Sequence, residues 1–137
     1  MADKNRIFVD TNIWLYAFME GKSEKVIKSR QILSKGTVIL SSQVLNEICI
    51  NLIKKARYTE ENLQILIVNI SNHFKVVPVN SDTILQASFI REKMDIDYWD
   101  SLIISSALIN DCKVLYSDIL PHNITVEGKL KIINPFV

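Results

Sequence analysis

The chain has 137 residues, the length of one domain with a single hydrophobic core, and we expect a single domain over residues 1–137. A hydrophobic fraction of 48% with only 3 Gly and 3 Pro excludes a disordered chain and long flexible linkers. The 16 Lys and Arg residues nearly balance the 15 Asp and Glu residues, which excludes a strongly basic chain, although a local basic face or bound cations can still attract nucleic acid.

The first predicted element is a short buried strand at Ile7–Val9, because its residues are β-branched or aromatic. Asn12 is expected to cap a helix directly after it. A second helix is expected to begin near Ser23 and to end at Gly36. The apolar run Thr37–Ser41 predicts a second buried strand.

Two long helices and a third strand follow. Ser42 is expected to cap the helix over 43–57, and Thr59 is expected to cap the helix over 60–74. The third strand is expected at Lys75–Val79.

The remaining elements are a helix over 83–93 capped by Ser81 or Asp82, a helix over 98–111 capped by Asp97, a strand at Lys113–Ser117 and a last strand in the tail over 128–137. Strands thus alternate with helices, and most strands are nearly continuous apolar runs. This pattern predicts an α/β fold with a mainly parallel central sheet that is flanked by helices on both faces.

Four acidic residues are expected at the carboxyl edge of the predicted sheet, where parallel α/β folds carry their working sites. Asp10 directly follows the first strand, and Asp118 follows the fourth strand after one hydroxyl residue, Ser117. Glu47 lies in the second turn of the helix after the second strand, and Asp100 lies in the first turn of a later helix. Crowded carboxylates raise one another's pKa, and a divalent cation such as Mg²⁺ or Mn²⁺ stabilises them. Such a site can align a phosphodiester and activate a water molecule.

Each of these acids also has an ordinary explanation when taken alone. Asp100 follows the expected cap Asp97 by three residues, so a role in the first helical turn explains it better than metal binding. Asp10 could be a loop acid, Glu47 a solvated helix residue and Asp118 a turn acid. Position relative to strand ends also selects Asp82, which follows the third strand, and Asp95 and Asp97 are further candidates near Asp100.

Five segments occur in an order and at intervals that resemble the PIN domain, in particular the ribonuclease toxins of VapBC-type toxin–antitoxin modules. They are FVDTNIW (8–14), SQVLNE (42–47), DYWDSLIISSAL (97–108), VLYSDIL (114–120) and VEGKLKIINPF (126–136). The resemblance covers nearly the whole chain. It implies a single PIN domain, a three-layer sandwich and cleavage of RNA phosphodiester bonds by an endoribonuclease that depends on Mg²⁺ or Mn²⁺.

The resemblance implies that four acids are both catalytic residues and metal ligands: Asp10, Glu47, Asp100 and Asp118. Asp10 and Asp100 would be the principal ligands. Glu47 would complete the site and orient or deprotonate the attacking water, and Asp118 would hold a second metal or bind through water.

Polar neighbours of these acids match the resemblance as well. Thr11 and Ser117 would orient the carboxylates through hydrogen bonds, and Asn12 matches a common polar position of the first motif. The chain departs from the family after the last acid, where ILPHNITVEG (119–128) stands in place of a glycine-containing turn, and Ser117 stands where Thr is common. The resemblance also implies that Asp118 is a more peripheral ligand than the other three acids.

The resemblance also implies partners: an RNA substrate, a second copy of the chain in a homodimer, and an antitoxin that covers helices near the N-terminus and inserts a basic side chain. Cations that could line the RNA approach form two groups. They are Lys22, Lys25, Lys28 and Arg30 along one helix, and Lys54, Lys55 and Arg57 at the end of another, where the helix dipole explains them better.

Other functions remain open. A PIN nuclease could process RNA without an antitoxin. An enzyme with an aspartyl nucleophile also carries an Asp after its first strand, but it needs a second acid where this chain has Asn12. Retention of all four acids disfavours a non-catalytic binding module. A Ser–His–Asp hydrolase is disfavoured because His73 lies at a helix end and His122 in a loop.

The cellular compartment is predicted from cysteines and apolar runs. Cys49 and Cys112 have no metal-type spacing, and we expect two buried free thiols in a reducing cytosol. No run approaches the ~18 apolar residues of a membrane span, and the N-terminal run is too short for a signal peptide. We therefore expect a soluble cytoplasmic protein with no membrane segment.

Overall fold

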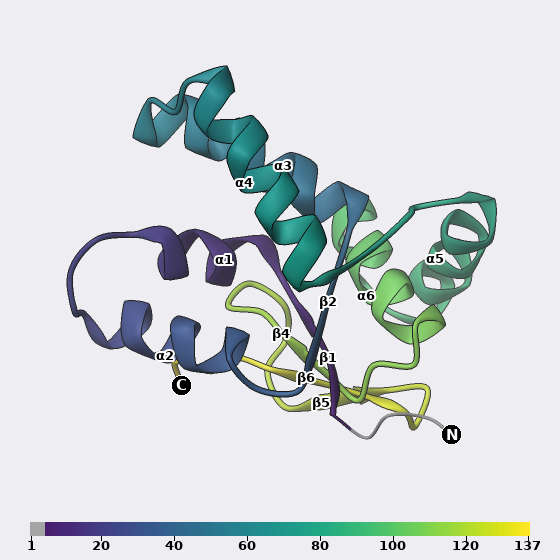
Figure 1. Cartoon of the computed structure of the whole chain (residues 1–137). Helices are drawn as coiled ribbons and strands as arrows, with labels where there is room; N and C mark the ends of the chain where they lie inside the picture. The colour runs from purple at the N-terminus through teal and green to yellow at the C-terminus, as the bar shows by residue number, and fades with distance from the viewer. Residues whose placement is uncertain (1–4) are drawn as a thin grey trace.

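The computed structural model describes residues 5–137 and has a central sheet between layers of helices (Figure 1). Its strands are β1 (Arg6–Val9), β2 (Thr37–Ser41), β3 (Lys75–Val77), β4 (Val114–Tyr116), β5 (Ile124–Val126) and β6 (Leu130–Ile133). They lie in the order β3-β2-β1-β4-β6-β5, and every neighbouring pair is parallel except β5 with β6. The predicted α/β fold with a mainly parallel sheet is confirmed.

The helices are α1 (Thr11–Phe18), α2 (Glu24–Leu33), α3 (Ser42–Ala56), α4 (Glu60–His73), α5 (Ser81–Lys93) and α6 (Tyr98–Ile109). Figure 1 shows α1 and α2 on one side of the sheet and α5 and α6 on the other, while α3 and α4 extend beyond the ends of β1 and β2. Across residues 5–137, no helix combines the length and the apolar character needed to cross a membrane.

Trp14 anchors α1 to the sheet and to the α3–α4 pair. Its side chain is fully buried, and its indole nitrogen donates a hydrogen bond to the backbone oxygen of Val9 (3.0 Å). The ring of Phe74 meets the Trp14 ring edge-on at a centroid distance of 4.9 Å. Aromatic contacts of this kind fix the relative orientation of elements as well as burying area. Trp14 therefore holds the end of β1, where Asp10 follows, at a defined position against the residue that ends α4.

The helix caps lie closer to the strands than the sequence predicted. The Ser41 side chain, and not that of Ser42, caps α3 by accepting a hydrogen bond from a backbone N–H. Asn80, and not Ser81 or Asp82, caps α5. In both cases the residue just before the predicted cap supplies the oxygen, so α3 begins one residue earlier than expected and α5 begins two residues earlier. The caps predicted for α4 and α6 are confirmed.

Two features of the sheet and one cysteine differ from expectation. β3 ends at Val77, directly before Pro78, which lacks the N–H that a longer strand would need. β5 was not predicted, because three residues carry too little alternation to be recognised.

Both cysteines are free, but only Cys112 is buried and Cys49 is half-buried.

Candidate active site

Asp10 lies where β1 turns into α1, and only 4% of its surface is exposed. Its Oδ1 accepts a hydrogen bond from the backbone N of Thr11 (2.8 Å), and its Oδ2 accepts one from Ser117 Oγ (2.9 Å). Asp10 is therefore the N-cap of α1, and the prediction that Asn12 caps this helix is wrong. Because the helix already begins at Thr11, the Asn12 amide points elsewhere and donates to Asp118 Oδ1 (3.2 Å).

Glu47 reaches the same end of the sheet from α3. Thr11 Oγ1 donates a hydrogen bond to Glu47 Oε2 (2.6 Å), and Gln43 Nε2 donates to Glu47 Oε1 (3.1 Å). Gln43 Nε2 also lies 3.3 Å from the backbone oxygen of Trp99, in the first turn of α6. Sequence reasoning missed Gln43, although its spacing four residues before Glu47 on one helix face was an available signal. These bonds connect α1, α3 and α6 around the acids.

Asp100 approaches from the first turn of α6. The Asp97 carboxylate accepts hydrogen bonds from the backbone N of Trp99 (3.0 Å) and of Asp100 (3.4 Å), so Asp97 is the helix cap. Burial raises the pKa of Asp100, and the charges of Asp97 and Glu47 raise it further. Asp97, and not Asp100, therefore accepts the hydrogen bonds that start the helix.

The charge on Asp10 is the most strongly disfavoured in the cluster. Burial raises its pKa to about 6, and hydrogen bonds from Thr11 and Ser117 lower the pKa without offsetting the burial. The charges of Glu47 and Asp100 raise the pKa of Asp10 further. The structure thus brings Asp10, Glu47 and Asp100 close enough to interact electrostatically.

Asp118 is held separately, by α1. Asn12 Nδ2 lies 3.2 Å from one carboxylate oxygen of Asp118, and the Tyr16 hydroxyl lies 3.3 Å from the other. Tyr16 is one turn after Asn12 on the same helix, so both donors come from one face of α1. The donor role of Tyr16 toward Asp118 was not predicted from sequence.

The side chains around these acids fit a hard divalent cation with water ligands. Within residues 5–137, no three His, Cys, Asp or Glu side chains converge into a preformed metal cage. Mg²⁺ usually keeps several waters and needs only one or two direct carboxylates, so a looser cluster suffices. The side-chain oxygen of Gln43 is buried and has no hydrogen-bond partner among the described residues. An unpartnered oxygen on a side chain that is bonded to Glu47 suits a water ligand of a hydrated cation.

Ser117→Ala should destabilise the protein. Ser117 is fully buried, and its hydroxyl donates to Asp10 Oδ2 while it accepts from the backbone N of Ile119 (3.3 Å) and of Leu120 (3.2 Å). Alanine leaves these groups unpaired, so we expect the free energy of unfolding to fall by about 1–2 kcal/mol. Urea denaturation measures this loss. The exposed Ser88→Ala variant serves as the control, and an unchanged midpoint for Ser117→Ala would contradict the hydrogen-bonding role.

Comparisons with solved structures find the same fold in toxin–antitoxin proteins. A toxin–antitoxin complex from Klebsiella pneumoniae is similar with a TM-score of 0.72 at 17% identity, over 94% of this chain and 97% of that chain. A sarcin–ricin-loop-cleaving VapC toxin from Mycobacterium tuberculosis gives a TM-score of 0.63 at 18% identity, over 80% and 86% of the two chains. A VapBC complex from Rickettsia felis bound to a promoter DNA fragment gives 0.68 at 18% identity, over 94% and 99%. At these identities the likeness shows a shared fold.

Comparison with protein families identifies the chain directly. No curated protein sequence matched it. The family described as PIN domain matches residues 7–120, which span β1 through β4 and include all four acids. This match covers most of the chain, and the chain belongs to the PIN domain family.

Proposed function

We propose that this PIN protein is an endoribonuclease that depends on Mg²⁺ or Mn²⁺, and that it is the toxin of a type II toxin–antitoxin pair. The observation that carries the proposal is the buried carboxylate of Asp10, whose pKa is raised by burial and by the charges of Glu47 and Asp100. A divalent cation compensates such charges. Membership of the PIN family supports a nuclease, and the toxin–antitoxin neighbours support an antitoxin partner.

Asp10 and Asp100 would hold the metal ion, directly or through water. When bound, the ion polarises the phosphodiester and lowers the pKa of a bound water. Glu47 is oriented by Thr11 and Gln43 and would accept the proton of the attacking water. In-line attack at phosphorus breaks the bond to the 3′ oxygen and leaves a 5′-phosphate and a 3′-hydroxyl. The Asp118 carboxylate would bind a second metal or a water ligand.

The direct test is cleavage of labelled RNA by the purified protein with Mg²⁺, with Mn²⁺ and with EDTA. We expect fragments that carry a 5′-phosphate with either metal and intact RNA with EDTA. Cleavage that continues in EDTA would exclude the metal-dependent mechanism. The same protein incubated with a phosphodonor should form no acyl phosphate, because Asp10 is buried and both its carboxylate oxygens accept hydrogen bonds.

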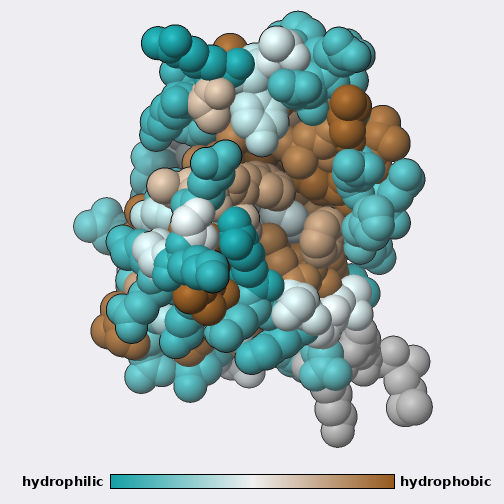
Figure 2. Space-filling model, turned by 60° about the vertical axis from the view of Figure 1, so that its left-hand side comes forward, coloured by the Kyte–Doolittle hydropathy of each residue, from teal (hydrophilic) through white to brown (hydrophobic). Residues whose placement is uncertain are grey.

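Exposed apolar side chains support a protein partner. Figure 2 shows brown side chains around a hollow, and others above it, at the height where α3 and α4 lie in Figure 1. The exposed large apolar residues of these two helices are Ile50, Ile53, Ile65 and Val68. Large apolar patches of this kind mark interaction sites. An antitoxin encoded beside this gene should co-purify with the protein. Expression of this protein alone should arrest growth, and co-expression of the antitoxin should relieve that arrest. A protein that arrests growth with no such neighbour would instead be an RNA-processing nuclease.

The expected homodimer and cytoplasmic location belong to the same proposal. α5 carries three exposed apolar residues, Ile84, Leu85 and Phe89, which are suited to a contact between copies. Light scattering should give the mass of two chains, and the mass of one chain would remove the homodimer from the proposal.

Two of the cations expected to guide RNA have structural contacts instead. Arg30 donates hydrogen bonds to the backbone oxygens of Ala17 (3.0 Å) and Met19 (2.6 Å), so it fixes α2 against the end of α1. The Lys25 ammonium lies 5.2 Å from the centre of the Tyr16 ring. Lys22 precedes α2 and does not lie on it. Lys28 lies on α2 and lines a pocket that contains none of the four acids, so none of these contacts supports a role for this group in guiding RNA to the acids.

Thr11→Val should slow RNA cleavage by about tenfold, in the range typical of residues that orient metal ligands. The Thr11 hydroxyl donates to Glu47 Oε2 at 2.6 Å, and valine keeps the shape while removing that donor. Initial cleavage rates at saturating Mn²⁺ measure the effect. Thr11→Ser keeps the hydroxyl and should retain most of the rate. Equal rates for Thr11→Val and wild type would show that Glu47 needs no orientation by Thr11.

A further inference from the structure

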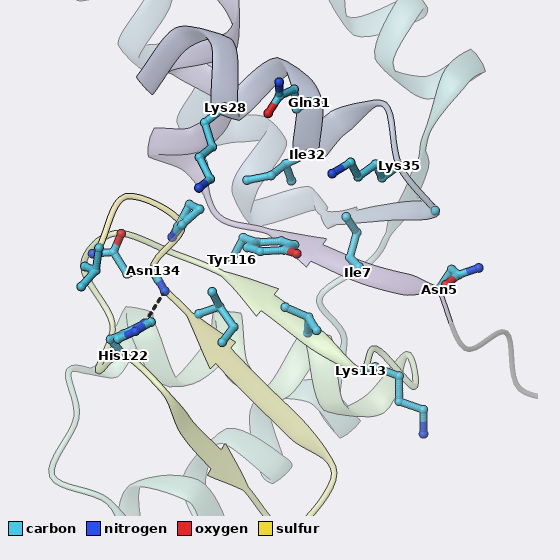
Figure 3. A pocket seen from close by; sticks show the side chains of 15 residues that line it. Asn5, Ile7, Lys28, Gln31, Ile32, Lys35, Lys113, Tyr116, His122 and Asn134 are labelled. Carbon is cyan, nitrogen blue, oxygen red and sulfur yellow. Dashed lines mark hydrogen bonds between the residues drawn. The ribbon is translucent and has the colours of Figure 1, made fainter. Parts of the chain in front are cut away.

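A pocket lies on the face of the sheet that α2 covers, and none of the four acids lines it (Figure 3). Its volume is about 540 Å³. The floor is apolar and aromatic, formed by side chains of β1, β4 and the end of β6: Ile7, Val114, Tyr116 and Ile133. α2, the turn after it and the C-terminal segment form the walls. A cavity of this size suits a small molecule or one unit of a polymer.

The charge around this pocket is positive. Three lysines line it: Lys28 on α2, Lys35 just after α2 and Lys113 just before β4. None of its lining residues is Asp or Glu, and none of the three lysines forms an ion pair with a carboxylate of residues 5–137. Figure 3 shows Lys28 and Lys35 directed toward the space over the Tyr116 ring, whereas Lys113 points away from it. Unpaired ammonium groups facing a cavity attract an anion.

Hydrogen bonds at one end of the pocket occupy the acceptors of His122 and Asn134 and leave their donor groups available. His122 Nδ1 accepts a hydrogen bond from the backbone N of Asn134 (2.9 Å), so in the neutral ring Nε2 carries the hydrogen (Figure 3). The side-chain oxygen of Asn134 accepts from the backbone N of Phe136 (3.0 Å), which leaves its amide group as a donor. His122, Asn134 and Lys28 thus add donors at the same end of the cavity.

We propose that this pocket binds a nucleoside phosphate, either as a free nucleotide or as one nucleotide of an RNA strand. The ammonium groups of Lys28 and Lys35, which face the space over the Tyr116 ring, contact the phosphate, and His122 and Asn134 add donors at one end of the cavity. The base lies on the Tyr116 ring and the adjacent apolar side chains, because aromatic stacking accepts any base. The site uses no residue of the acidic cluster, so it is separate from the proposed cleavage reaction. Only the RNA-strand form rests on the proposed function.

The test is calorimetric titration of the full chain with adenosine 5′-monophosphate, adenosine, inorganic phosphate and a short single-stranded oligoadenylate. All titrations contain EDTA, so that a bound metal ion makes no contribution. We expect the monophosphate to bind more tightly than adenosine or phosphate alone, because its base contacts the apolar floor and its phosphate contacts the lysines. The double variant Lys28→Gln/Lys35→Gln should weaken its binding by about tenfold or more. Tyr116→Leu should weaken the monophosphate more than inorganic phosphate.

Lys54→Gln/Lys55→Gln is the matched control, since it removes two exposed lysines at the end of α3 and should leave binding unchanged. If the oligoadenylate binds through the same lysines and competes with the monophosphate, the pocket takes an RNA strand. If only the monophosphate binds, the ligand is a free nucleotide. The proposal is overturned if neither ligand binds, or if the Lys28/Lys35 variant binds as wild type does. A protein that cleaves no RNA could still pass this test, so the two proposals fail separately.

Discussion

Asp100→Asn should lower the rate of metal-dependent RNA cleavage by a factor of roughly 10² to 10³, the loss typical when one preorganised electrostatic contact to the reaction is removed. The substitution removes a carboxylate whose pKa is already raised by burial and by the charges of Asp97 and Glu47. Asparagine has nearly the same shape. Because Asp97 caps α6, the helix should begin at the same residue in the variant.

Two measurements separate a loss of metal binding from a loss of fold. Mn²⁺ titration should show weaker binding by Asp100→Asn, while its circular dichroism and urea midpoint stay close to those of wild type. Asp95→Asn is the matched control, because Asp95 is an exposed acid five residues earlier and should retain full activity. Cleavage by Asp100→Asn at the wild-type rate would remove Asp100 from the proposed site.

Much of this arrangement could be predicted from the sequence because two local rules act together. Short apolar runs predict parallel strands, and the carboxyl ends of parallel strands meet at one edge of the sheet. That reasoning placed Asp10 next to the elements that carry Glu47 and Asp100, and the electrostatic coupling among the three agrees with the placement. The fold class could be predicted from the order of strands and helices alone.

Contacts between distant segments could not be predicted in the same way. The bond of Gln43 to Trp99 joins two helices, and its existence depends on how α3 and α6 pack. Arg30 looked like a cation for RNA, because a sequence does not reveal that the backbone oxygens of Ala17 and Met19 lie within its reach. The predicted helix caps of α3 and α5 were wrong for a different reason. Several residues that can cap a helix follow one another in the sequence, and the exact end of the preceding segment decides which of them is the cap.

Asp10→Asn should make the metal-free protein more stable at neutral pH by about 1–3 kcal/mol. In the folded chain the pKa of Asp10 is about 6, above its ordinary value of 3.8. Between these two values the folded state holds a proton that the unfolded state has released. Stability therefore falls as the pH rises from about 4 to about 6, by about 1.4 kcal/mol for each pKa unit. Asparagine has no charge to bury, so the variant does not lose this stability. Its weaker hydrogen bonds with Ser117 and Thr11 offset part of the gain, which explains the lower end of the expected range.

Urea denaturation of both proteins in EDTA at several pH values measures the effect. Wild type should lose stability between about pH 4 and pH 6, whereas Asp10→Asn should change less over the same interval. Mn²⁺ should raise the melting temperature of wild type and have little effect on the variant, because a ligand stabilises only the state that binds it. If Asp10→Asn is less stable than wild type at every pH, the charge of Asp10 in the wild-type protein is already compensated by its surroundings. A gain in stability that accompanies loss of cleavage would instead mean that the buried charge is maintained for a bound cation, at a cost to the free protein.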